Sequence, residues 1–335
     1  MSNLEKNQIQ IGYIPLLDCV ALLWAKHRGF FEDVGLHVEL VREASWASLR
    51  DRLAFGFLDA AHCLSAMLPA AAIGQDQLGI PLKTPLVLSQ NRAFITLSQK
   101  LCFELGIQID DAPLISAEKI VEAMSKDRHL INTIKFAHVY KQSIHHYCLR
   151  EWLALADENL AKNIQLQTLP PPYMVEALNN HHIDGFCVGE PWNTEAEVMG
   201  IGHKILSSQA IIPTVADKVL AVTDEWATSN PNTLKAMCHA IQKAQQELQK
   251  LDNFNEVWNL LIEFHIIRFE CSETIHVQKY HAIQNIIRSF VGDDISPNPN
   301  DFKWLIEQMQ KWDDVIFKEN QIEEISHSCI ISLIE

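Results

Sequence analysis

The sequence has 335 residues, of which 48% are hydrophobic and 21% are charged. A chain of this length exceeds one ordinary core, so about two domains are expected, and the composition is that of a globular protein, not of a disordered one. The net charge of −15 disfavours direct binding to nucleic acid or to an anionic membrane, because both attract clustered Lys and Arg.

Short apolar strands alternate with helical periodicity through the first two thirds of the chain, which is typical of α/β units with parallel strands. The pattern predicts strands at 9–14, 37–41, 60–62, 134–139 and 185–188, and helices at 19–28, 46–55, 117–124 and 145–156. The segment 85–98 is rich in β-forming residues and is a candidate crossing between lobes. Three consecutive prolines at 170–172 block a helix until Tyr173.

The pattern changes to nearly all helix from Asn232 onward. Helices are predicted at 233–251, 254–263, 272–288 and 301–318. Because the composition shifts near 220–232 without a low-complexity linker, we interpret this region as a return to an earlier lobe and not as a new domain.

The cysteines and the first residues bear on the compartment. Eight widely spaced cysteines without a C-x-x-C pair favour buried reduced thiols, with disulfides as the weaker alternative. The first ten residues are polar and contain no apolar signal segment, and no apolar run reaches the roughly 18–20 residues of a membrane span. A cytoplasmic location is therefore expected.

Enzyme motifs are absent from the sequence. A phosphate-loop pattern begins at Gly74 and Gly79, but Ile80 and Pro81 stand where Lys and Ser or Thr are required. No G-x-S-x-G nucleophile elbow occurs. The histidine doublets 145–146 and 181–182 are poor chelates because adjacent side chains diverge. We therefore expect no catalytic residues, no metal and no cofactor.

Three longer segments carry a resemblance to a known family. They are 42–56 (REASWASLRDRLAFG), 183–193 (IDGFCVGEPWN) and 217–227 (DKVLAVTDEWA), and 12–19 (GYIPLLDC) adds to them. Together they resemble the cyanobacterial nitrate- and bicarbonate-binding proteins (NrtA/CmpA-like) over about residues 9–250.

The resemblance implies an α/β, two-lobed periplasmic-binding-protein type II fold with a helical C-terminal region. Lobe 1 would comprise 1–97 plus 219–335 and lobe 2 would comprise 98–218, with the ligand cleft between the lobes and closure of the lobes on the ligand.

The resemblance also implies which residues bind the ligand. Trp46, His145 and Lys218 match the family's principal ligand residues, and Pro171 and Val188 match positions that line its pocket. His145 has independent support, because the first turn of a helix favours an anion. Each residue also has a structural alternative: a core tryptophan, a helix-capping histidine, a solvated lysine or plain scaffold.

Two comparisons with the family bear on the ligand. The bicarbonate branch replaces the family's His and Lys by Gln and an acidic residue, so retaining both favours nitrate or nitrite. Where the family has an amide before its A-I-T-L-S segment, this chain has Ala93, and Gln99 is the candidate substitute. Replacing Lys218 by alanine is expected to abolish the response to ligand without unfolding the protein.

The expected function follows from the resemblance together with the polar N-terminus. The chain is most similar to the family's cytoplasmic branch, the NasS-type nitrate sensors, which hold a NasT-like RNA-binding antiterminator until nitrate or nitrite releases it. One alternative is the solute-binding component of a nitrate ABC transporter. A remote alternative is a pyrimidine-synthase-like enzyme, against which Cys187 stands alone without a cysteine cluster.

Overall fold

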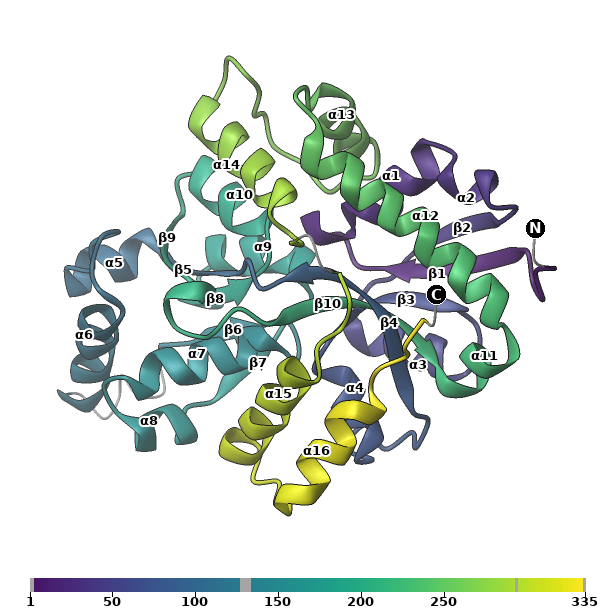
Figure 1. Cartoon of the computed structure of the whole chain (residues 1–335). Coiled ribbons are helices and arrows are strands. Elements are labelled where there is room, and N and C mark those ends of the chain that lie inside the picture. The colour runs from purple at the N-terminus through teal and green to yellow at the C-terminus, as the bar shows by residue number, and fades with distance from the viewer. Residues whose placement is uncertain (1–2, 127–133, 293–294, 334–335) are drawn as a thin grey trace. The chain divides into compact units, whose positions relative to one another are not determined.

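A computed structural model describes residues 3–126, 134–292 and 295–333 (Figure 1). The chain divides into two compact units. Unit 1 comprises Met1–Gln90, Val215–Ile267 and Ala282–Glu335, and unit 2 comprises Asn91–Thr214 and Arg268–His281. Each unit contains one five-stranded mixed sheet with helices packed on it, which confirms the predicted two-lobed α/β fold.

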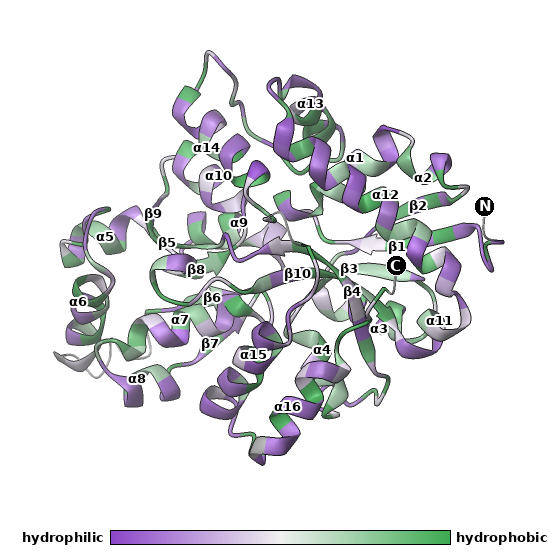
Figure 2. Cartoon of the chain, viewed as in Figure 1, coloured by the Kyte–Doolittle hydropathy of each residue, from purple (hydrophilic) through white to green (hydrophobic). Residues whose placement is uncertain are grey.

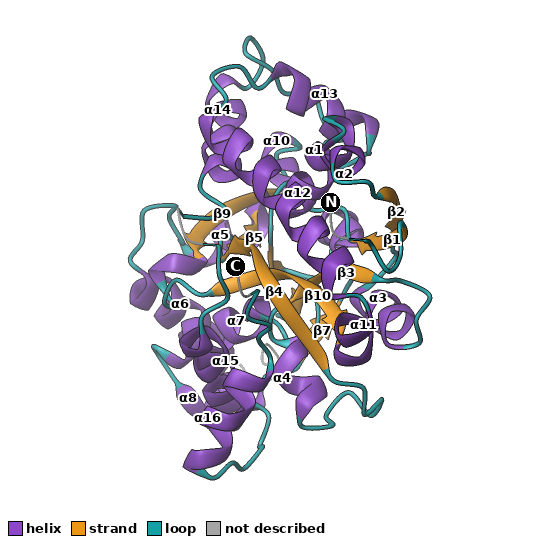
Figure 3. Ribbon diagram, turned by 45° about the vertical axis from the view of Figure 1, so that its right-hand side comes forward, coloured by secondary structure: helices purple, strands orange, loops and turns teal. Residues whose placement is uncertain are grey.

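The sheet of unit 1 has the strand order β2-β1-β3-β10-β4. The strands are β1 (Gln8–Tyr13), β2 (His37–Arg42), β3 (Ala60–Leu64), β4 (Leu82–Gln90) and β10 (Ala216–Thr223). β1 is parallel to β2 and β3. β10 is antiparallel to β3 and β4, and Figure 3 shows β10 beside β4. β3 and most of β10 are buried, as expected of strands covered on both faces.

Helices of unit 1 precede and follow these strands. They are α1 (Val20–His27), α2 (Phe30–Asp33), α3 (Trp46–Ala54), α4 (Met67–Ala72), α11 (Asp224–Ser229), α12 (Pro231–Lys250), α13 (Asn255–Glu263), α15 (Pro299–Trp312) and α16 (Glu319–Ser328), with a 3₁₀ turn η1 (Leu17–Cys19). Along α12, hydrophobic and hydrophilic residues alternate as in an amphipathic helix (Figure 2). Among the described helices, none combines the length and apolarity that a membrane span requires.

Unit 2 repeats the same pattern of strand directions. Its order is β7-β6-β8-β5-β9, made of β5 (Phe94–Ser98), β6 (Phe136–His138), β7 (Leu166–Thr168), β8 (Gly185–Val188) and β9 (Gly202–Ser207). Its helices are α5 (Gln99–Leu105), α6 (Pro113–Lys126), α7 (Ile144–Ala154), α8 (Glu158–Asn163), α9 (Met174–Asn179) and α10 (Trp192–Val198). β6 is parallel to β7 and β8, and β5 is antiparallel to β8 and β9.

The unit boundaries differ from the boundaries expected after residues 97 and 218. β5 pairs with β8 and β9, so it belongs to unit 2 and not to the first lobe. Lys218 pairs with strands of unit 1, although the expected range placed it in the second lobe. A further boundary falls after His281, within α14 (Val277–Arg288).

Two predicted helices of the C-terminal region have different bounds. α14 begins at Val277 and not at residue 272, because the Ser272 hydroxyl accepts hydrogen bonds from the amides of Thr274 and Ile275 and closes a turn there. The helix predicted over 301–318 ends at Trp312. Asp314 has a φ of 56°, a left-handed conformation that stops a helix, and α16 follows.

β4 is one of the two outer strands of the unit 1 sheet. Its Thr84 amide donates to the carbonyl of Cys329 (2.8 Å), and the Ile331 amide donates to the carbonyl of Thr84 (2.9 Å). The segment after α16 thus pairs with this edge of the sheet at Thr84.

Candidate ligand-binding site

Trp46 is placed by the start of α3. Ser45 is extended (φ −154°, ψ 160°), and its side chain accepts a hydrogen bond from the Ser48 amide (3.2 Å), which caps the helix. Trp46 is therefore the first helical residue, and its side chain is 1% exposed. The start of α3 at Trp46 agrees with the helix predicted at 46–55.

Lys218 lies on β10 and is fully buried. It stands opposite Leu64 of β3 and Ser89 of β4, and Leu220, two residues further on, stands opposite His62. Because residues two apart on a strand share a face, the side chains of Lys218 and His62 lie on one face of the sheet.

A buried charged group, which we call the Lys218 cluster, surrounds this ammonium. Its members are Asp18, Trp46, His62, Asp217 and Lys218, all in unit 1. Lys218 Nζ lies 2.7 Å from Asp217 Oδ1 and 3.2 Å from Asp18 Oδ2. The other oxygen of Asp18 lies 2.9 Å from His62 Nε2. Asp18 thus links the lysine to the histidine.

Aromatic contacts complete the Lys218 cluster. Lys218 Nζ lies 5.6 Å from the centroid of the Trp46 ring, within the range of a cation–π contact. The rings of Trp46 and His62 are 5.7 Å apart, centroid to centroid. In the described part of the chain, neither Trp46 Nε1 nor His62 Nδ1 has a hydrogen-bond partner, and both atoms are buried.

Burial and charge pairing shift the pKa values of the acidic and basic side chains of the Lys218 cluster in opposite directions. Burial alone would raise the pKa of Asp18, but the charge of Lys218 and the interaction with the His62 ring hold this pKa below its ordinary value. Burial raises the pKa of Asp217 to about 6 against the pull of Lys218. Burial would lower the pKa of Lys218, yet the two carboxylates raise it. Lys218 is therefore a charged ammonium at neutral pH.

The pKa of His62 is lowered, whereas that of Lys218 is raised. Burial lowers the pKa of its imidazole, and the neighbouring Lys218 charge adds to that effect, although Asp18 opposes both. Without ligand, His62 is therefore neutral at pH 7. Because Nε2 faces an ionised carboxylate, Nε2 carries the proton and Nδ1 is a bare acceptor.

His145 lies in unit 2, on the first turn of α7 as predicted, and is fully buried. The Ser143 side chain caps this helix by accepting from the His146 amide (3.2 Å). His146, which replaces the family's Asn, packs its ring 4.6 Å from that of His138. Burial lowers the pKa of both rings, to about 4 for His138, so this histidine pair is neutral at pH 7.

The other predicted residues also belong to unit 2. Pro171 is buried at the start of a 3₁₀ turn, and Val188 is buried at the end of β8, where its carbonyl accepts from Asn193 Nδ2 (2.9 Å). Gln99 is exposed on α5 and lines a surface hollow with Phe103 and His203. None of the other predicted residues lines that hollow. Within unit 1 the structure brings Trp46 and Lys218 together.

Much of the segment 183–193 serves the fold of unit 2. Glu190 accepts hydrogen bonds from the amide and the hydroxyl of Thr194 (2.9 Å each) and pairs with Lys204 Nζ (3.0 Å). Asn193, besides its bond to Val188, accepts from the Thr96 hydroxyl (2.8 Å). These bonds fasten the start of α10 to the sheet, which gives the segment a structural role.

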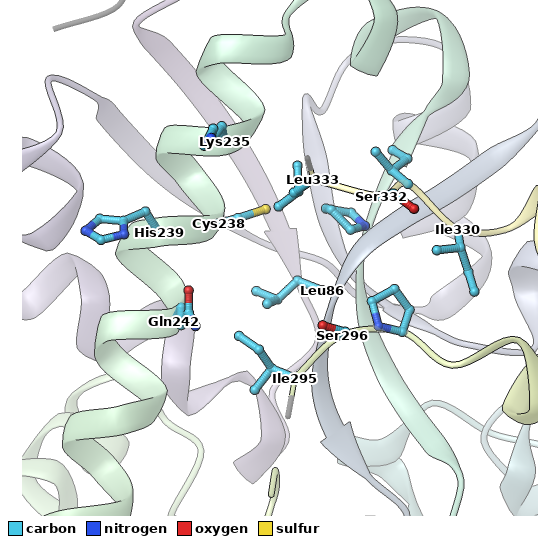
Figure 4. A pocket seen from close by; sticks show the side chains of 13 residues that line it. Leu86, Lys235, Cys238, His239, Gln242, Ile295, Ser296, Ile330, Ser332 and Leu333 are labelled. Atoms are coloured by element: carbon cyan, nitrogen blue, oxygen red, sulfur yellow. The ribbon is translucent and has the colours of Figure 1, made fainter. Parts of the chain in front are cut away.

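A separate cavity of about 550 Å³ lies in unit 1 (Figure 4). It is lined by α12 residues including Cys238, by Leu86 of β4, by Ile295 and by Ile330 near the C-terminal end. None of the predicted ligand residues lines it. Across the described ranges, no group of three or more His, Cys, Asp or Glu side chains is arranged to hold a metal ion.

Sequence reasoning missed Asp18, His62 and Asp217. Asp18 and Asp217 lie inside two of the segments that carry the resemblance, but neither was predicted to contact Lys218. A signal was available, because a lysine inside a buried strand requires counter-charges and a neighbouring aspartate is the nearest source. The sequence contains no similar signal that would have indicated His62.

The fold defines the class of protein, a two-lobed α/β protein of the periplasmic-binding-protein type. The crystal structure of the periplasmic nitrate-binding protein NrtA from Synechocystis has the same fold, with a TM-score of 0.82 and 24% identity, over 98% of this chain and 87% of that chain. Residues 2–262 match the NMT1-like family, and the chain belongs to this family.

Two curated relatives are similar along most of the chain. Bicarbonate transport ATP-binding protein CmpC of Synechocystis sp. is 32% identical over 98% of this chain and 50% of its own length. Nitrate/nitrite binding protein NrtA of Nostoc sp. is 30% identical over 76% of this chain and 56% of its own length. The chain therefore spans about half the length of the curated relatives it matches.

Proposed function

We propose that this protein binds nitrate or nitrite and does not catalyse a reaction on it. The observation that carries the proposal is the Lys218 ammonium, fully buried and kept charged beside the face of Trp46. Nitrate and nitrite are flat monoanions, and a charged donor with an aromatic wall suits their shape and charge. The name of the NrtA relatives, nitrate/nitrite binding protein, supports the same ligands. The ATP-binding activity in the name of CmpC is not transferred, because this sequence contains no phosphate loop.

The predicted contacts remain part of this proposal. In unit 1 they are Trp46 and Lys218, and in unit 2 they are His145, Pro171, Val188 and Gln99. Gln99 is the weakest of them because its side chain is exposed.

Thermal unfolding with nitrate, nitrite, bicarbonate or chloride at equal ionic strength tests the proposal. A ligand at about 100 times its dissociation constant adds about 2.7 kcal/mol of stability. We expect a shift with nitrate or nitrite and none with chloride. Equal shifts for all four salts would mean that no selective anion site exists.

Trp46→Phe supplies a variant that keeps the aromatic wall but removes the Nε1–H donor. We expect about tenfold weaker binding, the effect of one lost hydrogen bond to an anion. Trp24→Phe is the matched control, since Trp24 is equally buried and its Nε1 donates to Glu247 (3.1 Å) outside the Lys218 cluster. An equal loss of affinity in both variants would contradict a direct role for Trp46.

We further propose that the protein is a cytoplasmic nitrate/nitrite sensor that binds a NasT-like antiterminator in a ligand-dependent way. All eight cysteines are buried free thiols, which suits a reducing compartment and supports this choice over the transporter component. Size-exclusion chromatography of the protein mixed with a NasT-like antiterminator tests it. The complex should form without nitrate and dissociate with nitrate, and co-elution under neither condition would favour the solute-binding component of an ABC transporter.

A further inference from the structure

We propose that His62 is a specificity-determining ligand residue, and that an anion lacking its own proton binds together with one proton that His62 takes up at Nδ1. The inference rests on the proposed binding of nitrate or nitrite. It concerns a residue that none of the sequence motifs indicated.

The geometry of His62 carries the first step. The side chain is fully buried, and its Nε2 lies 2.9 Å from Asp18 Oδ1. Its Nδ1 is buried without a hydrogen-bond partner among the described residues. A buried ring nitrogen without a partner costs free energy, so a ligand that satisfies it gains that amount.

A second unpartnered atom lies in the same group. Trp46 Nε1 is buried and lacks a partner in the described chain, and the Trp46 ring is 5.7 Å from the His62 ring. Lys218 Nζ lies beside that same tryptophan ring. Once Nδ1 carries a proton, these two ring nitrogens and the ammonium of Lys218 form a set of donors suited to a small oxyanion.

The charge balance within unit 1 carries the second step. Asp18 and Asp217 contribute two negative charges and Lys218 contributes one positive charge, so the Lys218 cluster is net negative while His62 is neutral. Adding a monoanion to a buried group that is already negative is unfavourable. One proton on His62 cancels the excess negative charge and turns Nδ1 from an acceptor into a donor.

The groups around His62 allow this proton to be gained. Asp18 on η1 favours the imidazolium, whereas Lys218 on β10 and burial oppose it. Asp217 is bound to Lys218, and the buried thiols of Cys19 and Cys63 stay protonated because burial raises the pKa of both. Tyr13 on β1 stays protonated because burial raises its pKa to about 12. Arg50 on α3 is a further cation, and its charge is offset by Asp51 (2.6 Å); α4 carries no titratable side chain. A bound anion adds to the effect of Asp18 and tips this balance.

The mechanism distinguishes classes of oxyanion. Nitrate and nitrite carry no proton near neutral pH, so one proton must move from solvent to His62 Nδ1 on binding. Bicarbonate has its own hydroxyl, which can donate directly to the unprotonated Nδ1. Bicarbonate can therefore satisfy Nδ1 without proton uptake, but the excess negative charge of the Lys218 cluster then stays uncompensated. We expect bicarbonate to bind more weakly than nitrate and with weaker dependence on pH.

Titration calorimetry of nitrate binding to the full chain, in Bis-Tris and in Tris near neutral pH, measures the protons taken up. The difference between the two enthalpies of binding should correspond to an uptake of nearly one proton per nitrate. Because affinity depends on the imidazolium, nitrate binding should weaken by about tenfold per pH unit above neutrality. His62→Gln should remove both effects while leaving nitrate binding measurable, since the amide of Gln can donate in place of Nδ1–H.

His27→Gln is the matched control, because His27 also pairs its Nε2 with a carboxylate (Glu256, 2.7 Å) but is solvent-accessible on α1. It should leave proton uptake unchanged. Nitrate binding without proton uptake would overturn this inference and leave the proposed function intact. Uptake that persists in His62→Gln but disappears in Asp217→Asn would assign the proton to Asp217 and overturn the role of His62. Absence of nitrate and nitrite binding at every pH would remove the proposed function and this inference together.

A measurement on the unmodified protein covers the case in which His62→Gln does not fold. With ¹⁵N-labelled histidine, one of the 15 imidazoles should change from the neutral to the doubly protonated pattern of nitrogen shifts on addition of nitrate. A spectrum in which nitrate binds and no imidazole changes its protonation would overturn the inference.

Discussion

At the scale of single residues, Lys218 has a structural role in addition to its proposed role in binding the ligand. It is fully buried, and two carboxylates lie within 3.2 Å of its ammonium. This arrangement alters one expectation from the sequence. Removal of the lysine would leave Asp18 and Asp217 as buried charges without their common counter-ion, so Lys218→Ala cannot be a purely ligand-deficient variant.

Lys218→Ala should lower the free energy of unfolding by about 3–5 kcal/mol near neutral pH, because it removes the counter-charge that two buried carboxylates share. Urea unfolding followed by circular dichroism measures this change. Lys243→Ala is the control: Lys243 pairs with Asp33 at 2.9 Å, but both side chains are exposed, so the cost should stay below about 1 kcal/mol. A similar small cost for both variants would show that the charges of the Lys218 cluster relax into solvent.

At the scale of elements, α3 determines where Trp46 lies. The helix begins immediately after Ser45, and the helical periodicity was sufficient to predict it at 46–55. Several strands were harder to predict. β7 has three residues, and β10 pairs with β3 and β4, which lie far away in the sequence. Local patterns therefore predicted most helices, whereas the pairing that brings Lys218 next to His62 depends on contacts that a local pattern does not contain.

Ser45→Ala should destabilise the protein by about 1 kcal/mol, because it removes the side-chain acceptor that caps α3. Nitrate affinity should fall as well, since the first turn of α3 orients the Trp46 ring. Ser45→Asp restores an acceptor at the cap and should recover stability. Chemical unfolding and nitrate titration of the two variants check this. Full stability in Ser45→Ala would indicate that the cap contributes nothing.

At the scale of the whole molecule, the sequence predicted the α/β fold, the return of the chain to its first unit and the burial of the thiols. The composition of the site was predicted only in part. Trp46 and Lys218 do lie together, but Asp18 and His62 join them through η1 and β3, which no motif connected. The charge balance of the site therefore became visible only in three dimensions.

All eight cysteines should be unreactive in the folded protein. They are buried, and burial raises the pKa of several thiols, to about 12 for Cys63 and Cys329 and about 11 for Cys102. Ellman's reagent should therefore label fewer than one thiol per chain quickly under native conditions and all eight in guanidinium chloride without reductant. Recovery of fewer than eight thiols after denaturation would reveal disulfides and count against the proposed cytoplasmic location.

The pairing of the segment after α16 with Thr84 also affects how the protein behaves at high concentration. An outer strand with free amides and carbonyls is a template on which another chain can add a strand and start aggregation. In β4, Pro85 removes one amide donor, and the hydrogen bonds to Cys329 and Ile331 occupy the backbone of Thr84. Residues 329–331 thus prevent another chain from pairing with β4 at Thr84. A tag or fusion attached near Ile331 would interfere with this protection.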